Sequence, residues 1–216
     1  MQITIREPGN ALTHFIAMLL AVAGSVPLLV KSGIGAGETY FKAMIVFIGS
    51  MILLYGASAL YHTLDVSPKV LQMFRKIDHM MIFVMIAGSY TPVCLIVLGG
   101  KTGMMLLGLV WTIALVGMGI NLFWITCPKW FSSMVYISLG WVCVLVFKQL
   151  LSLLPISAFL WLLAGGIIYT IGGIIYALKL QVFNGKYKNF GSHAVFHLFV
   201  MGGSICHFIF MYGYVA

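Results

Sequence analysis

Residues 191–214 read GSHAVFHLFVMGGSICHFIFMYGY, a stretch without Asp, Glu, Lys or Arg. An apolar segment of about 20 residues is long enough to cross the hydrocarbon core of a bilayer as an α-helix. Its basic side chains are those of His193 and His197 near its start and of His207 further along. The stretch therefore predicts a membrane-spanning helix that carries a histidine pair at one end.

The rest of the chain repeats this apolar pattern. The 216 residues are 62% hydrophobic and 7% charged, with a mean hydropathy of +1.09, whereas soluble domains contain roughly 45–50% apolar residues. Connecting stretches such as Lys31–Tyr40, Thr63–Ile77 and Leu180–Phe190 are too short to form a domain. We expect an all-α fold, a single seven-transmembrane-helix domain over residues 1–216, whose first helix is retained rather than cleaved as a signal peptide. The predicted spans lie at about 11–30, 41–62, 79–99, 103–126, 131–150, 157–179 and 191–214.

The basic residues lie almost wholly between the apolar runs, so the net charge of +8 indicates topology signals and contacts with anionic lipids rather than nucleic acid binding. Eight bases share the amino-terminal side and four lie opposite, which predicts a cytoplasmic amino end and an extracytoplasmic carboxyl end. The eight are Arg6, Lys69, Arg75, Lys76, Lys129, Lys179, Lys186 and Lys188, and the four are Lys31, Lys42, Lys101 and Lys148.

This organisation suits a multi-pass protein of the bacterial inner membrane. Its short loops leave little surface for a soluble protein partner, so the partners we expect are membrane lipids. The four cysteines are scattered singly, without CxxC spacing, and are expected to be reduced thiols. They are Cys94, Cys127, Cys143 and Cys206.

The predicted topology gathers four ionisable side chains near the cytoplasmic interface. His193 and His197 are four residues apart, so their imidazoles lie one turn apart on one helix face and can reach one metal ion. His62, at the end of the second span, supplies a third nitrogen. Asp78, at the entry to the third span, is either a fourth ligand or a carboxylate that holds metal-bound water. Ionisable groups in a membrane are costly and are normally paired or functional. Imidazole ligands favour Zn²⁺ over Ca²⁺ or Mg²⁺.

Other polar residues fall close to this group. Ser58 precedes His62 by one turn, so its hydroxyl either stabilises an oxyanion or orients a ligand, or else bonds its own helix backbone. Glu7, Asn10 and His14 form one stripe at the entry of the first span. They either support the metal ligands or form an interfacial cap, in which Asn10 satisfies orphan amides.

Two further features lie next to or beyond this interface. His79 follows Asp78 but lies about 100° round the helix, so we expect it to face elsewhere. His207 shares the helix face of His193 but lies about 15 Å deeper than His197. It cannot bind the same ion, and is either a proton-path or pocket residue or a buried histidine bonded across helices.

Helix breakers mark two more places. Pro92 follows the polar run Gly88–Thr91 and would clash with the carbonyl of Gly88. The resulting kink would either open a cavity above the metal or ease packing. Glycine pairs favour close contact between helices, and they occur at Gly165-Gly166, Gly172-Gly173 and Gly202-Gly203.

Taken together, these motifs resemble the bacterial haemolysin III branch of the progestin and adiponectin receptor family, over nearly the whole chain. The likeness rests on Ser58 with His62, Asp78, the Ala-Gly-Ser-Tyr-Thr-Pro run ending at Pro92, and the pair His193 and His197, and it includes Glu7, Asn10 and His14. The family's adiponectin receptors and the related alkaline ceramidases are seven-helix proteins with a zinc ion held by three histidines, and an aspartate contacts the zinc-bound water. The resemblance implies that His62, His193 and His197 are the ligands and Asp78 the water partner, with Ser58 as a nearby hydroxyl.

The residues and the resemblance together favour a zinc-dependent intramembrane hydrolase of a lipid amide or ester, with Asp78 and Ser58 as catalytic residues. A non-enzymatic sensor or regulator of membrane lipid homeostasis, with a structural zinc, is the alternative. A cytolytic pore fits poorly, because a water-filled path needs polar side chains through the full bilayer depth. Proton-coupled transport lacks an acidic residue near the predicted midplane.

Overall fold

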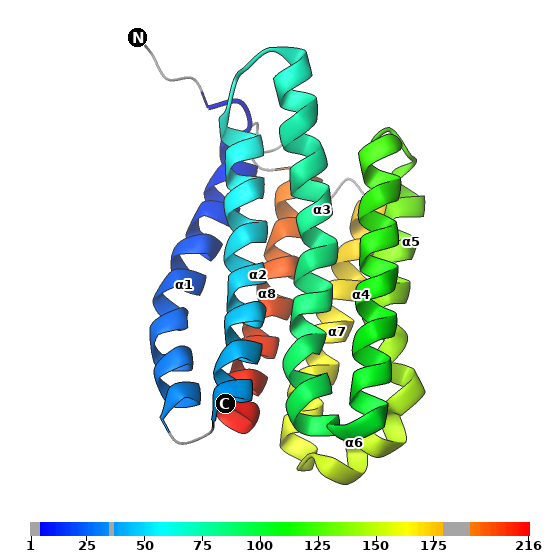
Figure 1. Cartoon of the computed structure of the whole chain (residues 1–216). Helices are drawn as coiled ribbons and strands as arrows, with labels where there is room; N and C mark the ends of the chain where they lie inside the picture. Colours follow the sequence, from blue (N-terminus) through cyan, green and yellow to red (C-terminus); the bar gives the residue numbers. More distant parts are fainter. Residues whose placement is uncertain (1–4, 35–36, 179–190) are drawn as a thin grey trace.

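The computed structural model describes residues 5–34, 37–178 and 191–216. In this part of the chain the secondary structure is helical throughout, and seven helices are long and apolar enough to cross a membrane. They run roughly side by side, up and down through one bundle (Figure 1). The predicted all-α, seven-span architecture is therefore confirmed.

Four of the seven spans are single α-helices and three contain a change of helix type. The single helices are α1 (Pro8–Gly33), α2 (Glu38–Thr63), α4 (Gly100–Phe123) and α7 (Ile156–Ala177). In the others, α3 (Pro68–Pro92) continues as the π-helix η1 (Val93–Leu98), and α8 (Ser192–Phe210) continues as the π-helix η3 (Met211–Val215). The fifth span passes from α5 (Lys129–Gly140) through the 3₁₀ segment η2 (Trp141–Val146) into α6 (Phe147–Leu153).

One predicted boundary is wrong. The third span begins at Pro68 rather than at about residue 79, so most of the predicted loop Thr63–Ile77 is helical and Asp78 lies inside α3. Proline suits the first turn of a helix, and the basic turns that follow extend α3 beyond its apolar part, where hydropathy gives no signal. The other described span ends lie within three residues of their predicted positions. The predicted loop 180–190, with Lys186 and Lys188, and also Lys179, lies outside the described residues.

The break in the fifth span is stabilised by a side chain of the third. The Tyr90 hydroxyl donates a hydrogen bond to the Gly140 carbonyl at 2.6 Å and accepts one from the Cys143 amide at 2.9 Å. Inside a membrane, backbone groups released from a helix need such replacement partners. Tyr90 itself lies just before Pro92, where α3 gives way to a π-helix. The two irregular segments are therefore joined to each other.

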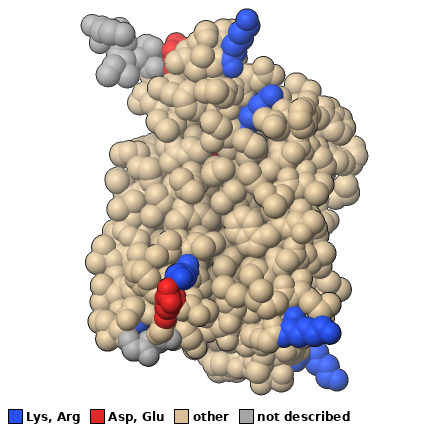
Figure 2. All heavy atoms as spheres, in the orientation of Figure 1, with Lys and Arg blue, Asp and Glu red and all other residues tan. Residues whose placement is uncertain are grey.

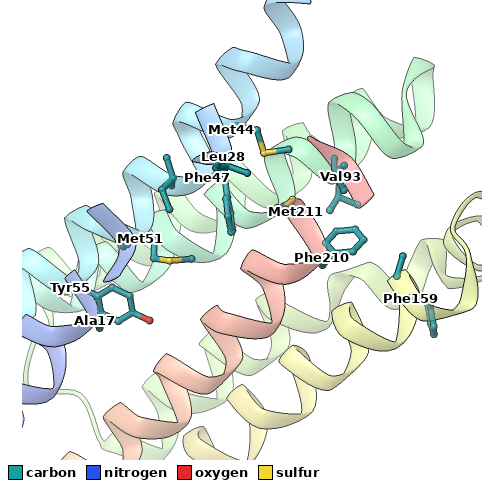
Figure 3. Packing of buried hydrophobic residues seen from close by; sticks show 14 of the residues in the cluster. Ala17, Leu28, Met44, Phe47, Met51, Tyr55, Val93, Phe159, Phe210 and Met211 are labelled. Atoms are coloured by element: carbon teal, nitrogen blue, oxygen red, sulfur yellow. The ribbon is translucent and has the colours of Figure 1, made fainter. Parts of the chain in front are cut away.

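The main apolar core lies at the end of the bundle that is opposite His62. Its fully buried members include Leu28, Met44 and Phe47 from α1 and α2, and Phe210 and Met211 at the junction of α8 with η3. Figure 3 shows these side chains directed toward one another. This half of the bundle buries mainly apolar side chains.

Close approach of α7 and α8 depends on glycine. A methyl group at Gly165 would overlap the His207 ring, and one at Gly203 would overlap the Tyr169 ring. The close helix contact predicted for the glycine pairs is confirmed at these two positions.

The outer surface suits lipid. Large apolar side chains such as Leu20 and Val116 are more than half exposed. On the face drawn in Figure 2, Lys and Arg lie near the two ends, with a wide uncharged band between them. The four cysteines are all free thiols, as predicted.

Candidate metal centre and adjoining cavity

Three histidines converge where α2 ends and α8 begins. His62 lies in the last turn of α2, and His193 and His197 lie in the first two turns of α8. One ring nitrogen from each lies within 4.8 Å of the others, and the rings of His62 and His197 are buried. Three ring nitrogens at this separation could hold one metal ion.

The tautomer of His62 is fixed by Glu7. The His62 Nδ1 atom lies 2.6 Å from Glu7 Oε2, and because a carboxylate only accepts hydrogen bonds, Nδ1 is the protonated nitrogen. The hydrogen bond from His62 is the main reason that the pKa of Glu7 falls to about 2, so Glu7 is ionised at neutral pH. The other nitrogen of His62, Nε2, is buried and makes no hydrogen bond to the described residues. Its lone pair is therefore available to a metal.

His197 is held in the same way from α1. Its Nδ1 atom lies 3.1 Å from Thr13 Oγ1 and 3.3 Å from the Asn10 carbonyl oxygen. Thr13 Oγ1 in turn donates to the Asn10 carbonyl at 2.9 Å, so the hydroxyl is free to accept a hydrogen bond from Nδ1–H. This arrangement leaves Nε2 of His197 as the unprotonated nitrogen.

Asn10 bonds to Glu7 beside His62 and does not cap α1. The residue before the first helical turn is Glu7, which makes no side-chain cap. The Asn10 side-chain amide instead donates to Glu7 Oε2 at 2.7 Å, the same oxygen that holds His62. The backbone amide of Glu7 donates to the His62 carbonyl at 3.0 Å. The predicted interfacial cap by Asn10 is therefore absent among the described residues, and Glu7 and Asn10 contact His62 instead.

His14 lies directly behind His197. The two rings stack, with centroids 3.5 Å apart and an angle of 11° between their planes. His14 is only 3% exposed, and neither of its nitrogens has a hydrogen-bond partner among the described residues. A buried imidazole without a hydrogen-bond partner is costly. The ring of His14 packs against His197, and it also borders the cavity described below.

A cavity of about 150 Å³, lined by His193 and His197 but not by His62, extends from this cluster into the bundle. Asp78 is buried in its wall but lies outside the group of three converging nitrogens. This position suits a carboxylate that faces water in the cavity better than a direct ligand. The Ser58 hydroxyl lies in the same wall next to Asp78 and makes no hydrogen bond to its own helix backbone. The backbone-bonded alternative for Ser58 is therefore wrong.

The prediction that His79 faces elsewhere is also wrong. His79 and Asp78 both line the cavity, because the cavity is wide enough to border two adjacent stripes of α3. His79 Nδ1 has no hydrogen-bond partner among the described residues, while its carbonyl accepts a hydrogen bond from the Tyr136 hydroxyl at 3.3 Å.

His207 combines both predicted roles. Its Nε2 atom lies 3.3 Å from the Leu162 carbonyl on α7, and its ring packs edge-on against Tyr169. It also lines the deep end of the cavity, beyond the reach of the three converging nitrogens. His207 is thus bonded across helices and is a pocket residue.

Sequence reasoning missed two groups of residues. Thr13 carries no signal of its own, since threonine is common in apolar helices. Tyr169 and Tyr176 line the cavity on α7, seven residues apart and therefore on one face. Polar aromatic groups at helical spacing inside a predicted span were the signal that could have found them.

The fold and this site define a multi-pass membrane protein with an interhelical histidine cluster. The "Haemolysin-III related" family model matches residues 2–208. Hemolysin-3 of Bacillus cereus is 36% identical over 214 residues, which cover 99% of this chain and 94% of that protein. The Hemolysin-3 homolog of Bacillus subtilis (strain 168) is 35% identical over 206 residues, 95% of this chain and 92% of that protein.

The chain therefore belongs to the haemolysin III family. Its seven apolar spans and its bacterial relatives identify it as a multi-pass integral protein of the bacterial inner membrane.

Proposed function

We propose that this protein is a zinc-dependent intramembrane hydrolase of a lipid amide or ester. One observation carries the proposal: nitrogens of His62, His193 and His197 converge, and the last two of these histidines line a cavity whose wall also contains Asp78 and Ser58. A membrane-embedded enzyme needs this combination of a polar reaction centre and a compartment for an acyl chain.

The residues present fit zinc. His62 has an orphaned, buried Nε2 atom, and hydrogen bonds to Nδ1 leave the Nε2 lone pairs of both His62 and His197 free. Zinc held by three neutral imidazoles keeps its charge and an open position, so when bound it polarises a carbonyl and lowers the pKa of water toward about 7.

The protein's own groups divide the remaining work. Asp78 accepts a proton from the attacking water and returns it to the leaving group. Ser58 donates a hydrogen bond to the oxyanion that develops on the substrate carbonyl. Glu7 and Thr13 keep the imidazoles in the tautomer that binds metal. The cavity excludes bulk water and aligns the acyl chain.

A membrane sensor with a structural zinc is the second candidate function. It is favoured by the way in which the centre joins chain segments that are distant in sequence. Arg6 donates to the Tyr61 carbonyl at 2.6 Å, Glu7 holds His62, and Thr13 holds His197. A metal bound there would link α1, α2 and α8, so the packing of the bundle would depend on whether the metal is bound.

The orientation of the chain completes the proposal. The excess of basic residues on the amino-terminal side would place the metal centre at the cytoplasmic interface. A reporter fused after Ala216 is expected to behave as extracytoplasmic. A cytoplasmic signal from that fusion, with a matched fusion in the α4–α5 turn as the reference for the opposite side, would overturn this orientation.

The test of the hydrolase is a lipid panel. Wild-type protein loaded with zinc should release fatty acid from at least one of a set of ceramides, lysolipids and simple esters, measured by mass spectrometry. The control is His193→Ala, which removes a proposed ligand. Zinc-loaded wild-type protein that releases no more fatty acid than this control would leave the sensor ahead.

A further inference from the structure

The cavity beside the histidines is not isolated within the bundle. A second cavity of about 60 Å³ lies beyond it, toward the opposite end of α7. The two cavities share six lining residues, which form the boundary between them: Ser89, Tyr90, Gly140, Trp141, Gly166 and His207. We call the first the near cavity, the second the far cavity, and this set of six the waist.

The waist lies where two spans are irregular. Tyr90 precedes the π-helical end of the third span, and Gly140 and Trp141 form the junction of α5 with the 3₁₀ segment. The Trp141 indole donates to Thr170 Oγ1 at 2.8 Å, which fixes the ring against α7. The position of the Trp141 ring is thus set by this hydrogen bond and by the start of the 3₁₀ segment.

The waist contains two glycines with space around them, Gly140 at the end of α5 and Gly166 on α7, and Gly166 is the one that faces the Trp141 ring. A methyl group added there would meet only the Trp141 ring, at 4.0 Å, an ordinary van der Waals contact. The neighbouring Gly165 differs, because a methyl group there would overlap His207. Gly165 is therefore required for helix packing, whereas Gly166 leaves space beside Trp141, between the near and the far cavity.

The far cavity is more apolar than the near one in the residues that belong to it alone. Its own lining includes Leu150, Phe159 and Leu163 and contains no acid or base. Along α7, Tyr176 at the histidine end is ten residues from Gly166, or about 15 Å of helix, and Phe159 is a further seven residues away, or about 10 Å. The two cavities therefore adjoin at the waist and follow one another along α7, with the polar groups at the histidine end.

We propose that Gly166 at the waist sets how far the acyl chain of the proposed lipid substrate extends along α7. The polar end of the lipid lies at the histidines, and a chain longer than the near cavity passes Gly166 into the far cavity. The inference rests on the proposed function for its choice of an acyl lipid, but it concerns binding and needs no turnover.

The experiment measures binding of saturated fatty acids, from octanoic to stearic acid, to the full-length purified protein by native mass spectrometry. Wild-type affinity should rise with chain length until both cavities are filled. Gly166→Leu should leave octanoic acid binding unchanged and weaken stearic acid binding by at least about tenfold, because each methylene kept out of an apolar site costs several-fold in affinity. Gly166→Ala should give a smaller loss in the same direction.

Two further variants place obstacles on either side of the waist. Ile82→Trp, which narrows the near cavity alone, should weaken binding at every chain length. Leu163→Trp, which fills the far cavity alone, should affect only the longest acids and serves if Gly166→Leu does not fold. Gly108→Leu, on an exposed face of α4 with open space around it, is the matched control and should change nothing.

Equal weakening of all chain lengths by Gly166→Leu, or none at any length, would overturn the inference. The outcome is separable from the hydrolase test. If the protein hydrolyses no lipid but shows the chain-length pattern, the proposed role of Gly166 stands and the hydrolase proposal fails. If the protein is a hydrolase whose chain-length profile is the same in wild type, Gly166→Leu and Leu163→Trp, only the proposed role of Gly166 fails.

Discussion

The two ends of α2 and α8 differ in what the helices bury against each other. At one end Phe47 and Phe210 are fully buried in an apolar cluster. At the other, the same two helices bury His62 and His197 beside Ser58. Apolar packing is sufficient to hold two membrane helices together. Burying histidines at the other end costs free energy, and packing alone does not require it. The difference indicates that the histidine end of these helices is retained for a reason other than packing.

A hydrogen-bonded trio separates the two halves. The Ser204 hydroxyl lies 2.5 Å from the Tyr55 hydroxyl and 2.9 Å from that of Tyr169. The trio satisfies three buried hydroxyl groups at once and joins α2, α7 and α8 near their middles. Changes in one half of the bundle should therefore have separate effects from changes in the other, and four predictions test this.

The largest effect is expected at the ligands. His193→Ala removes one of three nitrogens, and the protein should lose its zinc entirely and melt at a lower temperature in detergent. His207→Ala, a buried histidine deeper on the same helix, should retain full zinc content. Elemental analysis of both variants makes the comparison, and equal zinc in the two would contradict the ligand set.

The next effect is on turnover. Asp78→Asn keeps size and hydrogen bonding but loses the base, so zinc should remain bound while lipid hydrolysis falls by about 10²–10⁴-fold. If the carboxylate closed a structural metal shell instead, the same substitution would weaken zinc binding and lower the melting temperature. The two readouts, metal content and fatty acid release, separate these cases.

The apolar half predicts a stability effect without a metal effect. Phe210→Ala leaves a cavity in a fully buried site and should lower the free energy of unfolding by about 3 kcal/mol. The value lies at the low end for such a truncation because lipid supplies no hydrophobic gain from burial. Unfolding in mixed micelles measures the loss. Zinc loss from folded Phe210→Ala protein would show that the halves are not separate.

The smallest effect is expected from a residue behind a ligand. Thr13→Val keeps the shape but removes the hydroxyl that accepts from His197, so zinc affinity should fall by about 10–100-fold. Competition with a chelator measures the affinity. Thr112→Val, an exposed threonine on α4, is the matched control. An unchanged affinity in Thr13→Val would remove Thr13 from the metal centre.

Sequence reasoning was most successful where one helix or one topology decided the outcome. The seven spans follow from the length of apolar runs, and the approach of His62 to His193 and His197 follows from the order in which the spans cross. The start of α3 was missed because a basic, proline-initiated turn has no apolar signal.

The cavity could not be predicted, since its shape depends on how six helices pack. His79 was misplaced for this reason, because helix angles alone do not give the width of the space beside α3. Thr13 was overlooked because its role exists only when α1 lies against α8. Which residues share a cavity is a tertiary property, and spacing along one helix gives only part of it.

The central claim is that His62, His193 and His197 hold zinc, and anomalous diffraction at the zinc absorption edge tests it most directly. Crystals of protein purified without added metal should give one strong peak per chain, about 2.0–2.1 Å from one nitrogen of each of the three histidines. The absence of a peak there, or a peak beside His14 or His207 instead, would contradict the account.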